Sequence, residues 1–307
     1  MSTLFSHFFQ KFNQIRPLEA DFTEVLESIA LKPKILYFYG KMPENIVKNG
    51  KSERPKTVAI VGSRHNTRYG EEVATKLASA LAKNGVIVVS GLAYGIDSIA
   101  HRAALAAGGR TIGVLGTPID YIYPKDHLPL AKEMIEKDGA IISEYAPGEK
   151  VITRYSFLER NRLISGLSDA VVVVEAAEKS GSLNTAAHAL EQGREVFAVP
   201  GNITNPLSQG CNKLIRQGAN PYTEPDDVLN FLFPERLKKP KKSGQALLFG
   251  DSEDETKILR ALADGLRSGE QIIETVSLNP SVFNETMTVL EIKGVVRSLG
   301  ANNWTLT

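Results

Sequence analysis

The sequence predicts an α/β fold, in which a doubly wound parallel sheet is followed by a small C-terminal winged-helix domain. Three observations predict it. Short apolar runs rich in β-branched residues alternate with helical patterns, and most of the runs end at a glycine. A stretch rich in proline and lysine breaks this alternation at residues 234–252. Residues 253–307 then contain three short helical patterns and a hairpin.

The alternation fixes the order of the predicted elements. Continuous apolar runs are typical of strands buried on both faces of a parallel sheet, and they lie at residues 35–40, 57–62, 86–91, 110–116, 140–144, 169–175 and 195–201. Helical patterns fill the intervals, at residues 69–85, 96–109, 128–139, 157–168 and 183–193. These βαβ units predict one domain over residues 35–233. Ligands of such sheets bind beyond the carboxyl ends of the strands.

The C-terminal part is predicted to consist of a linker and a small domain. Residues 234–252 form a basic, solvated linker, because five cations fall within seven positions: Arg236, Lys238, Lys239, Lys241 and Lys242. Residues 253–307 form a winged-helix-like domain whose hairpin turns at residues 300–303. Its third helix and the following strand carry both signs of charge, at Glu285, Glu291, Lys293 and Arg297. That is not the charge of a strong duplex binder, so DNA and protein contacts both stay open for this domain.

Composition bounds the function further. The chain of 307 residues has a formal net charge of +1, so any attraction to polyanions must come from local patches. The single cysteine, Cys211, excludes an internal disulfide. No apolar stretch approaches the length of a signal-peptide core or a membrane span, so we expect a cytoplasmic protein without membrane contact.

Common cofactor and catalytic motifs are missing. The first strand is not followed by G-x-G-x-x-G, and there is no Walker A lysine loop, so redox and NTPase functions are excluded. The five histidines lack metal-ligand spacing, and no nucleophile elbow is found; we expect no cofactor, no metal and no catalytic residue. His101 is predicted to pack or hydrogen-bond beside Asp97. Glu175, at a strand end, is predicted to hold a neighbouring loop or arginine.

Three segments favour an anion instead. Ser63 and Arg64 follow a strand and offer a hydroxyl and a planar fork suited to phosphate. The segment 90–97, "SGLAYGID", has two glycines expected to turn backbone N–H groups outward. "SGS" at 180–182 opens a helix and predicts an anion site at its N-terminus.

The fourth segment mixes cations with rings. "TRYSFLERNR" (153–162) interleaves arginines with aromatic side chains, as single-stranded nucleic acids require: charge follows the phosphates and rings stack on bases. An ordinary solvated face is the alternative, with Glu149 and Glu159 pairing these arginines.

Together these segments resemble the DprA/Smf family of DNA-processing proteins. The resemblance rests on seven blocks in the family's order, spanning roughly residues 35–232: "VAIVGSR", "SGLAYGIDSIAHRAAL", "GTPIDYIYP", "ISEYAPG", "FLERNRLISGLSDAVVVVEA", "SGSLNTAAHALEQGREVFAVPGN" and "GCNKLIRQGA". The tail looks like the family's winged-helix module. Leu158 stands where the family usually has proline, and the N-terminal helical extension is reduced to residues 1–34.

The resemblance implies a dimeric, cytoplasmic single-stranded-DNA-binding protein with an extended Rossmann-like fold. Members of the family protect incoming strands in natural transformation, load the RecA recombinase onto them, and are not known as enzymes. Carried onto this chain, the binding residues are Ser63, Arg64, Arg154, Phe157, Arg160, Arg162, Ser180, Gly181 and Ser182.

Two rivals from other classes remain. The fold also looks like LOG (lysine-decarboxylase-like) phosphoribohydrolases, but the matching loop has Ala187 or His188 where their glutamate belongs. A protein-interaction scaffold with a vestigial pocket is the other; the intact arginines argue against it.

Overall fold

A computed structural model of the chain describes residues 12–48, 51–151, 153–236 and 250–306. The chain divides into two units, at residues 1–233 and 234–307. Of the predicted basic linker, residues 237–249 lie outside the described ranges.

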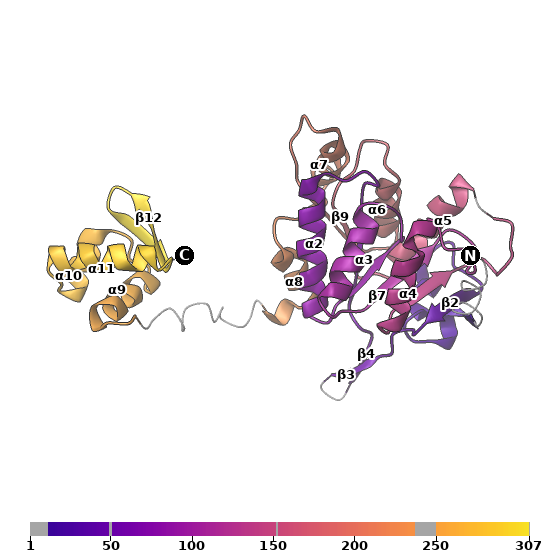
Figure 1. Ribbon diagram of the computed structural model, residues 1–307, viewed down its shortest axis with the longest axis horizontal. Coiled ribbons are helices and arrows are strands. Elements are labelled where there is room, and N and C mark those ends of the chain that lie inside the picture. The colour runs from indigo at the N-terminus through magenta and orange to yellow at the C-terminus, as the bar shows by residue number, and fades with distance from the viewer. Residues whose placement is uncertain (1–11, 49–50, 152, 237–249, 307) are drawn as a thin grey trace. The chain divides into compact units, whose positions relative to one another are not determined.

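The larger unit is built on a sheet of nine strands in the order β1-β2-β8-β7-β6-β5-β9-β10-β11 (Figure 1). Seven neighbouring strands are parallel and match the predicted runs, apart from the last, short one: β5 (Thr57–Val61), β6 (Ile87–Ser90), β7 (Thr111–Leu115), β8 (Ala140–Ser143), β9 (Ala170–Val173), β10 (Glu195–Ala198) and β11 (Asn220–Pro221). Strand order reverses at β5, which has β6 on one side and β9 on the other. The α/β doubly wound prediction is therefore confirmed.

One edge of the sheet departs from the parallel prediction. β2 (Leu36–Gly40) runs antiparallel to β8, and β1 (Asn13–Ile15) runs antiparallel to β2. A separate hairpin, β3 (Ile46–Lys48) and β4 (Lys51–Glu53), stands apart from this sheet. An apolar run records burial and not strand direction, so the sequence pattern could not reveal the reversal.

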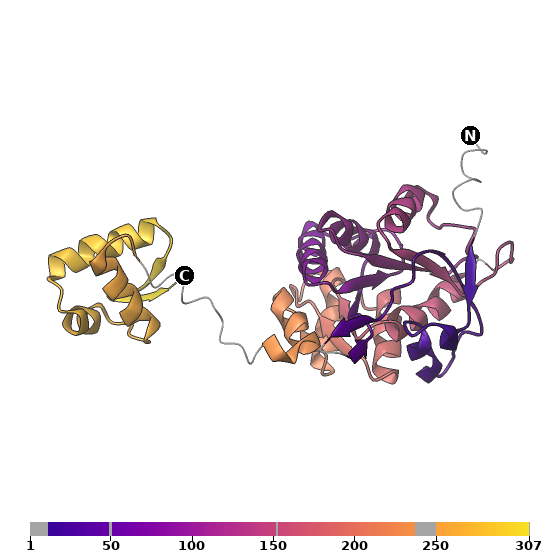
Figure 2. The ribbon, with the colours of Figure 1, turned by 90° about the horizontal axis from the view of Figure 1, so that it is seen from below.

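Helices cover both faces of the sheet (Figures 1 and 2). One face carries α2 (Arg68–Lys83), α3 (Ile96–Ala106), α4 (Leu128–Glu136) and α8 (Pro225–Leu232). The other carries α5 (Arg154–Gly166), α6 (Gly181–Glu191) and α7 (Gln209–Arg216). Short 3-10 helices directly precede α4 and α7, at η3 (Lys125–His127) and η4 (Pro206–Ser208), and η5 (Pro234–Arg236) follows α8. No helix within the described ranges is long and apolar enough to cross a membrane.

The prediction of a helical segment at residues 1–34 needs correction. Residues 1–11 lie outside the described ranges, and residues 12–34 contain β1 and two 3-10 helices, η1 (Pro17–Glu19) and η2 (Glu24–Ser28). The segment closes the core: Leu26 is fully buried, and a Cβ on Gly166 of α5 would lie 2.8 Å from its side chain. Packing against α5, rather than helix propensity, thus decides its shape.

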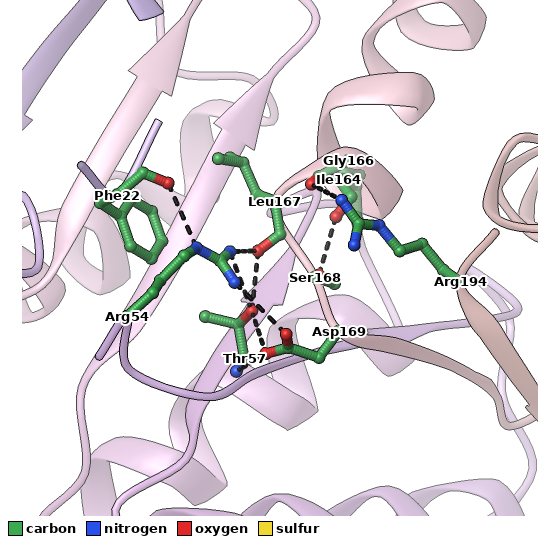
Figure 3. Close-up of polar contacts among 9 residues, drawn as sticks. All are labelled: Phe22, Arg54, Thr57, Ile164, Gly166, Leu167, Ser168, Asp169 and Arg194. Atoms are coloured by element: carbon green, nitrogen blue, oxygen red, sulfur yellow. Dashed lines mark hydrogen bonds and ion pairs between the residues drawn. The ribbon is translucent and has the colours of Figure 1, made fainter. Parts of the chain in front are cut away.

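Two arginines hold the C-terminal end of α5 (Figure 3). Arg54 donates to the carbonyl oxygen of Leu167 and pairs with the Asp169 carboxylate at 3.4 Å. Arg194 donates to the carbonyl oxygen of Gly166 at 3.3 Å. Cations satisfy the free carbonyls and the negative pole of a helix C-terminus. The helix is therefore fixed at one end while its other end faces the carboxyl edge of the sheet.

The smaller unit has the predicted winged-helix layout. Its helices are α9 (Glu253–Ala263), α10 (Gly269–Val276) and α11 (Pro280–Ile292), and its hairpin pairs β12 (Val296–Gly300) with β13 (Asn303–Leu306). Ala301 and Asn302 form the turn with positive φ angles of 46° and 55°, as a tight two-residue hairpin requires. Phe283 is fully buried at the centre of this unit's own core.

Candidate nucleic-acid interface

A cleft of about 920 Å³ opens at the carboxyl ends of β5, β6, β7 and β9, where the strand order reverses. This is the place where doubly wound sheets bind ligands. The loops after β5 and β6 cross closely beneath it, because a Cβ on Gly95 would overlap the Ser63 carbonyl oxygen. Gly95 also has a φ of +73°, so glycine is required there on both counts.

Most residues proposed from the sequence line this cleft. They are Ser63, Arg64, Arg154, Phe157, Arg160, Ser180, Gly181 and Ser182. Sequence reasoning did not single out several other lining residues, among them Tyr123, Lys179 and Asn184. Lys179 could have been found, because it directly precedes the "SGS" turn.

Three cations of the cleft have no carboxylate within ion-pair distance among the described residues: Arg64, Arg154 and Lys179. The Arg64 guanidinium lies 6.0 Å from the centre of the Phe157 ring, close enough for a cation–π contact. That ring is 5.4 Å from the ring of Tyr123. The cleft thus combines unpaired positive charge with partly exposed aromatic faces, the pairing that binds phosphates and unpaired bases.

The first turn of α6 adds the positive pole of a helix. Ser180 is its N-cap: the Ser180 hydroxyl accepts from the Ser182 backbone N–H and bonds the Ser182 hydroxyl at 2.8 Å. A Cβ on Gly181 would have no atom of the described residues within 4 Å, so the turn is open at this position. Asn184 accepts from Asn161 of α5 at 3.2 Å, which joins the two helices that wall the cleft. An anion fits such a helix terminus.

Arg160 forms part of the buried floor. Its guanidinium donates to the carbonyl oxygens of Gly91, at 2.8 Å, and Val114. Burial lowers the pKa of Arg160 to about 10 and raises the pKa of Asp97, while each charge opposes the shift of the other. Two of the three guanidinium nitrogens of Arg160, Nε and Nη1, therefore bond within the protein.

The loop at 90–97 also differs from expectation. Its N–H groups were expected to face outward, but those of Gly91 and Ala93 donate to the Asp97 carboxylate, at 3.1 and 3.4 Å. A Cβ on Gly91 would lie 2.7 Å from both Asp97 and Arg160. Gly91 is thus needed to let these two charged groups pack beneath the loop.

Arg162 does not line the cleft. One of its terminal nitrogens donates to both oxygens of Glu144 at 2.8 Å, and the residue is 8% exposed. Helix geometry explains the difference: Phe157, Arg160 and Ile164 share one face of α5, while Arg162 lies about 200° further round the helix than Arg160. Its pairing is structural in this geometry.

In the alternative interpretation, Glu149 and Glu159 pair with the arginines of α5 on a solvated face. The two carboxylates have other partners. Glu149 accepts from the backbone N–H of Ala146, and Glu159 accepts from the Tyr145 hydroxyl. Neither carboxylate pairs with an arginine of α5 in the described part of the chain. Arg154 therefore keeps its charge available to a ligand.

Two other predicted roles can be compared with the structure. Glu175 is buried and accepts from the backbone N–H and the hydroxyl of Thr67, at 2.9 and 2.5 Å, so it holds a neighbouring loop as predicted. His101 bonds the Thr111 hydroxyl at 2.6 Å, not Asp97, and burial lowers its pKa to about 3. No cluster of three or more metal-binding side chains is found in the part of the chain that the structure describes.

Comparison with known families and proteins identifies the family to which the chain is similar. Residues 13–233 match the family model for DNA recombination-mediator protein A, and residues 241–302 match the DprA winged helix domain. The chain is 44% identical to the DNA processing protein DprA of Bacillus subtilis over 69% of this chain and 68% of that one. It is 51% identical to the protein Smf of Escherichia coli over 57% of its length, and it spans 46% of that relative.

Two solved structures are similar to the chain. DNA processing protein A from Streptococcus pneumoniae shares 41% identity at a TM-score of 0.62, covering 73% of this chain and 75% of that one. The same kind of protein from Helicobacter pylori shares 31% identity at a TM-score of 0.64, over 75% and 98%. That second structure is described as showing a single-stranded DNA binding mode.

Proposed function

The chain belongs to the DNA recombination-mediator protein A family, a family of DNA-processing proteins, and on that premise we propose that it binds single-stranded DNA in the cleft at the strand-order reversal. The observation that carries the proposal is a cleft lined by the partly exposed ring of Phe157 and by three cations without a carboxylate partner among the described residues, Arg64, Arg154 and Lys179. The cations bind phosphates, and the ring stacks on an unpaired base. The bases of a duplex are already paired and stacked, so their faces are not available to the ring.

The wider role proposed is the one the family resemblance implies. The protein protects incoming DNA in natural transformation, loads RecA recombinase onto it, acts as a cytoplasmic homodimer and has no enzymatic activity. The phosphoribohydrolase alternative is not favoured, because α6 offers Ala187 or His188 in place of the acid that the reaction needs.

The test is fluorescence anisotropy with a labelled oligothymidylate of about 30 nucleotides beside a duplex of equal length, at about 50 and about 200 mM salt. We expect tighter, salt-sensitive binding of the single strand. The Phe157→Ala variant should lose about 1–3 kcal/mol of binding free energy, the value of one base–aromatic stack. Equal affinity for strand and duplex, or an unchanged Phe157→Ala affinity, would contradict the proposal.

A further inference from the structure

Two exposed tyrosines continue the aromatic surface of the cleft along the carboxyl edge of the sheet. Tyr123, in the loop after β7, lines the cleft and is 41% exposed. Tyr94, in the loop after β6, is 44% exposed and lies next to the lining residue Ala93, outside the cleft itself. Because β6 and β7 are neighbours in the sheet, the two loops lie at adjacent positions on one edge.

Tyr94 is held in place although it is exposed. Its hydroxyl donates to the Asp126 carboxylate at 2.7 Å, and its ring meets the His127 ring edge-on at 5.0 Å. His127 is buried and bonds the Leu92 carbonyl oxygen at 2.8 Å, which anchors the pair to the loop after β6. A fixed ring loses little conformational entropy when it stacks on a ligand.

The two tyrosines are linked through one connection of the chain. Tyr94 donates to Asp126, which lies three residues after Tyr123 in the connection between β7 and α4. Tyr123 in turn lies 5.4 Å from the Phe157 ring, tilted by 50°. The Tyr123 ring therefore contacts Phe157, and Tyr94 is bonded to the same connection three residues further on.

Charge accompanies this series of rings. The exposed Lys125 lies in η3, two residues after Tyr123, with its ammonium 5.8 Å from the Tyr121 ring. The nearby Asp126 carboxylate accepts a hydrogen bond from the Tyr94 hydroxyl, which partly offsets its negative charge. Tyrosine faces beside a cation suit unpaired bases with their phosphates directed outward.

We propose that Tyr123 and Tyr94 form a second base-stacking site, which binds the unpaired nucleotides that leave the cleft on the β7 side. This rests on the proposed single-strand function and extends it, because it leads the bound strand out of the cleft over the loops that follow β7 and β6. The occupant is the same DNA strand, because Tyr123 lines the cleft and contacts Phe157, and Tyr94 is bonded to the connection that carries Tyr123.

The test compares oligothymidylates of about 4 and about 16 nucleotides, the range of site sizes that single-strand-binding modules cover. Tyr94→Leu should leave the affinity for the short strand within about twofold and lower that for the long strand about fivefold or more, the effect of one stacked base. Tyr123→Leu should weaken both, because Tyr123 also lines the cleft. Tyr94→Phe keeps the ring and should bind the long strand nearly as the parent does.

The matched control is Tyr69→Leu. Tyr69 is 47% exposed and its hydroxyl donates to the Pro200 carbonyl oxygen, so it has similar exposure and anchoring on α2, away from β7. It should bind both strands as the parent does. Tyr94→Trp adds a second readout that does not depend on the leucine variants folding: the added fluorescence should be quenched by the long strand and not by the short one.

The outcomes separate the two proposals. A parent protein that binds neither strand would overturn the single-strand function and this site with it. A parent that binds both, with Tyr94→Leu equal to Tyr69→Leu at each length and no quenching of Tyr94→Trp, would overturn the second stacking site alone.

Discussion

Replacing Arg64 by alanine removes one of the three cleft cations that lack a carboxylate partner among the described residues. If each of the three neutralises one phosphate, they contribute about −2.1 to the slope of log affinity against log salt, at about −0.7 per phosphate of a single strand. Raising salt from about 50 to about 200 mM then weakens binding about 18-fold through these contacts. Without Arg64 the slope contribution falls to about −1.4 and the loss to about 7-fold. Affinity at low salt also falls about tenfold or more, the value of one charge-assisted contact.

The assay is anisotropy with an oligothymidylate across a salt series, beside Arg68→Ala as control. Arg68 is four positions further on, its side chain is 92% exposed, and it pairs with Glu72 at 3.0 Å. That substitution should leave the slope unchanged. The decisive quantity is the difference in slope between the variants, about 0.7. Any contribution of the basic residues at 236–242 to the slope is the same in the parent and in both variants, so it cancels in the difference. Equal slopes for Arg64→Ala, Arg68→Ala and the parent would refute the assignment of Arg64 to a phosphate.

Buried groups and the division of the chain support four more predictions. Arg162→Ala should lower the free energy of unfolding by about 3 kcal/mol in urea, because it leaves Glu144 without its partner; normal stability with lost DNA affinity would make Arg162 a ligand instead. His101, with its pKa lowered to about 3 by burial, stays neutral in the folded chain and charges only in the unfolded chain below about pH 6.5. Stability is therefore lost as pH falls from about 6.5 toward 3, by about 1.4 kcal/mol per pH unit, and His101→Gln should flatten that profile; identical profiles would contradict this. Cys211 is fully buried with its pKa raised to about 12, so a thiol reagent at about pH 8 should label it only after unfolding. A chain without residues 234–307 should keep most of its single-strand affinity; its complete loss would move the site to the other unit.

The sequence pattern predicted the sheet well because burial on both faces produces runs that are easily recognised. It missed α7, the short β11 and α8, of which the last two lie in a segment with prolines at 221 and 225. The signal for α8 was present: the Asp227 carboxylate accepts from the backbone N–H groups of Thr223 and Glu224, an N-terminal capping arrangement. Strand direction and the packing of residues 12–34 depend on tertiary contacts, which no local pattern encodes.

The site was predicted in its residue types but not in their roles. Arg160 and Arg162 are both arginines of α5 and stand only two positions apart. Helix periodicity alone separates them, because Arg160 lies on the face toward the cleft and Arg162 on the face toward Glu144. Whether an arginine meets a ligand depends on its acceptors within the fold. Arg160 donates to two carbonyl oxygens, whereas no such acceptor is found for Arg64 among the described residues.

The distribution of charge in the cleft explains how a chain with a net charge of +1 can attract a polyanion. At the floor, the charge of Asp97 offsets that of Arg160, so the buried pair contributes little field outside. The rim keeps its positive charge at Arg64, Arg154 and Lys179, close to the positive pole of α6. Local field, and not net charge, therefore sets the attraction. A substitution that removes the Asp97 charge would leave Arg160 buried without its counter-charge, and it would cost stability before it increased affinity.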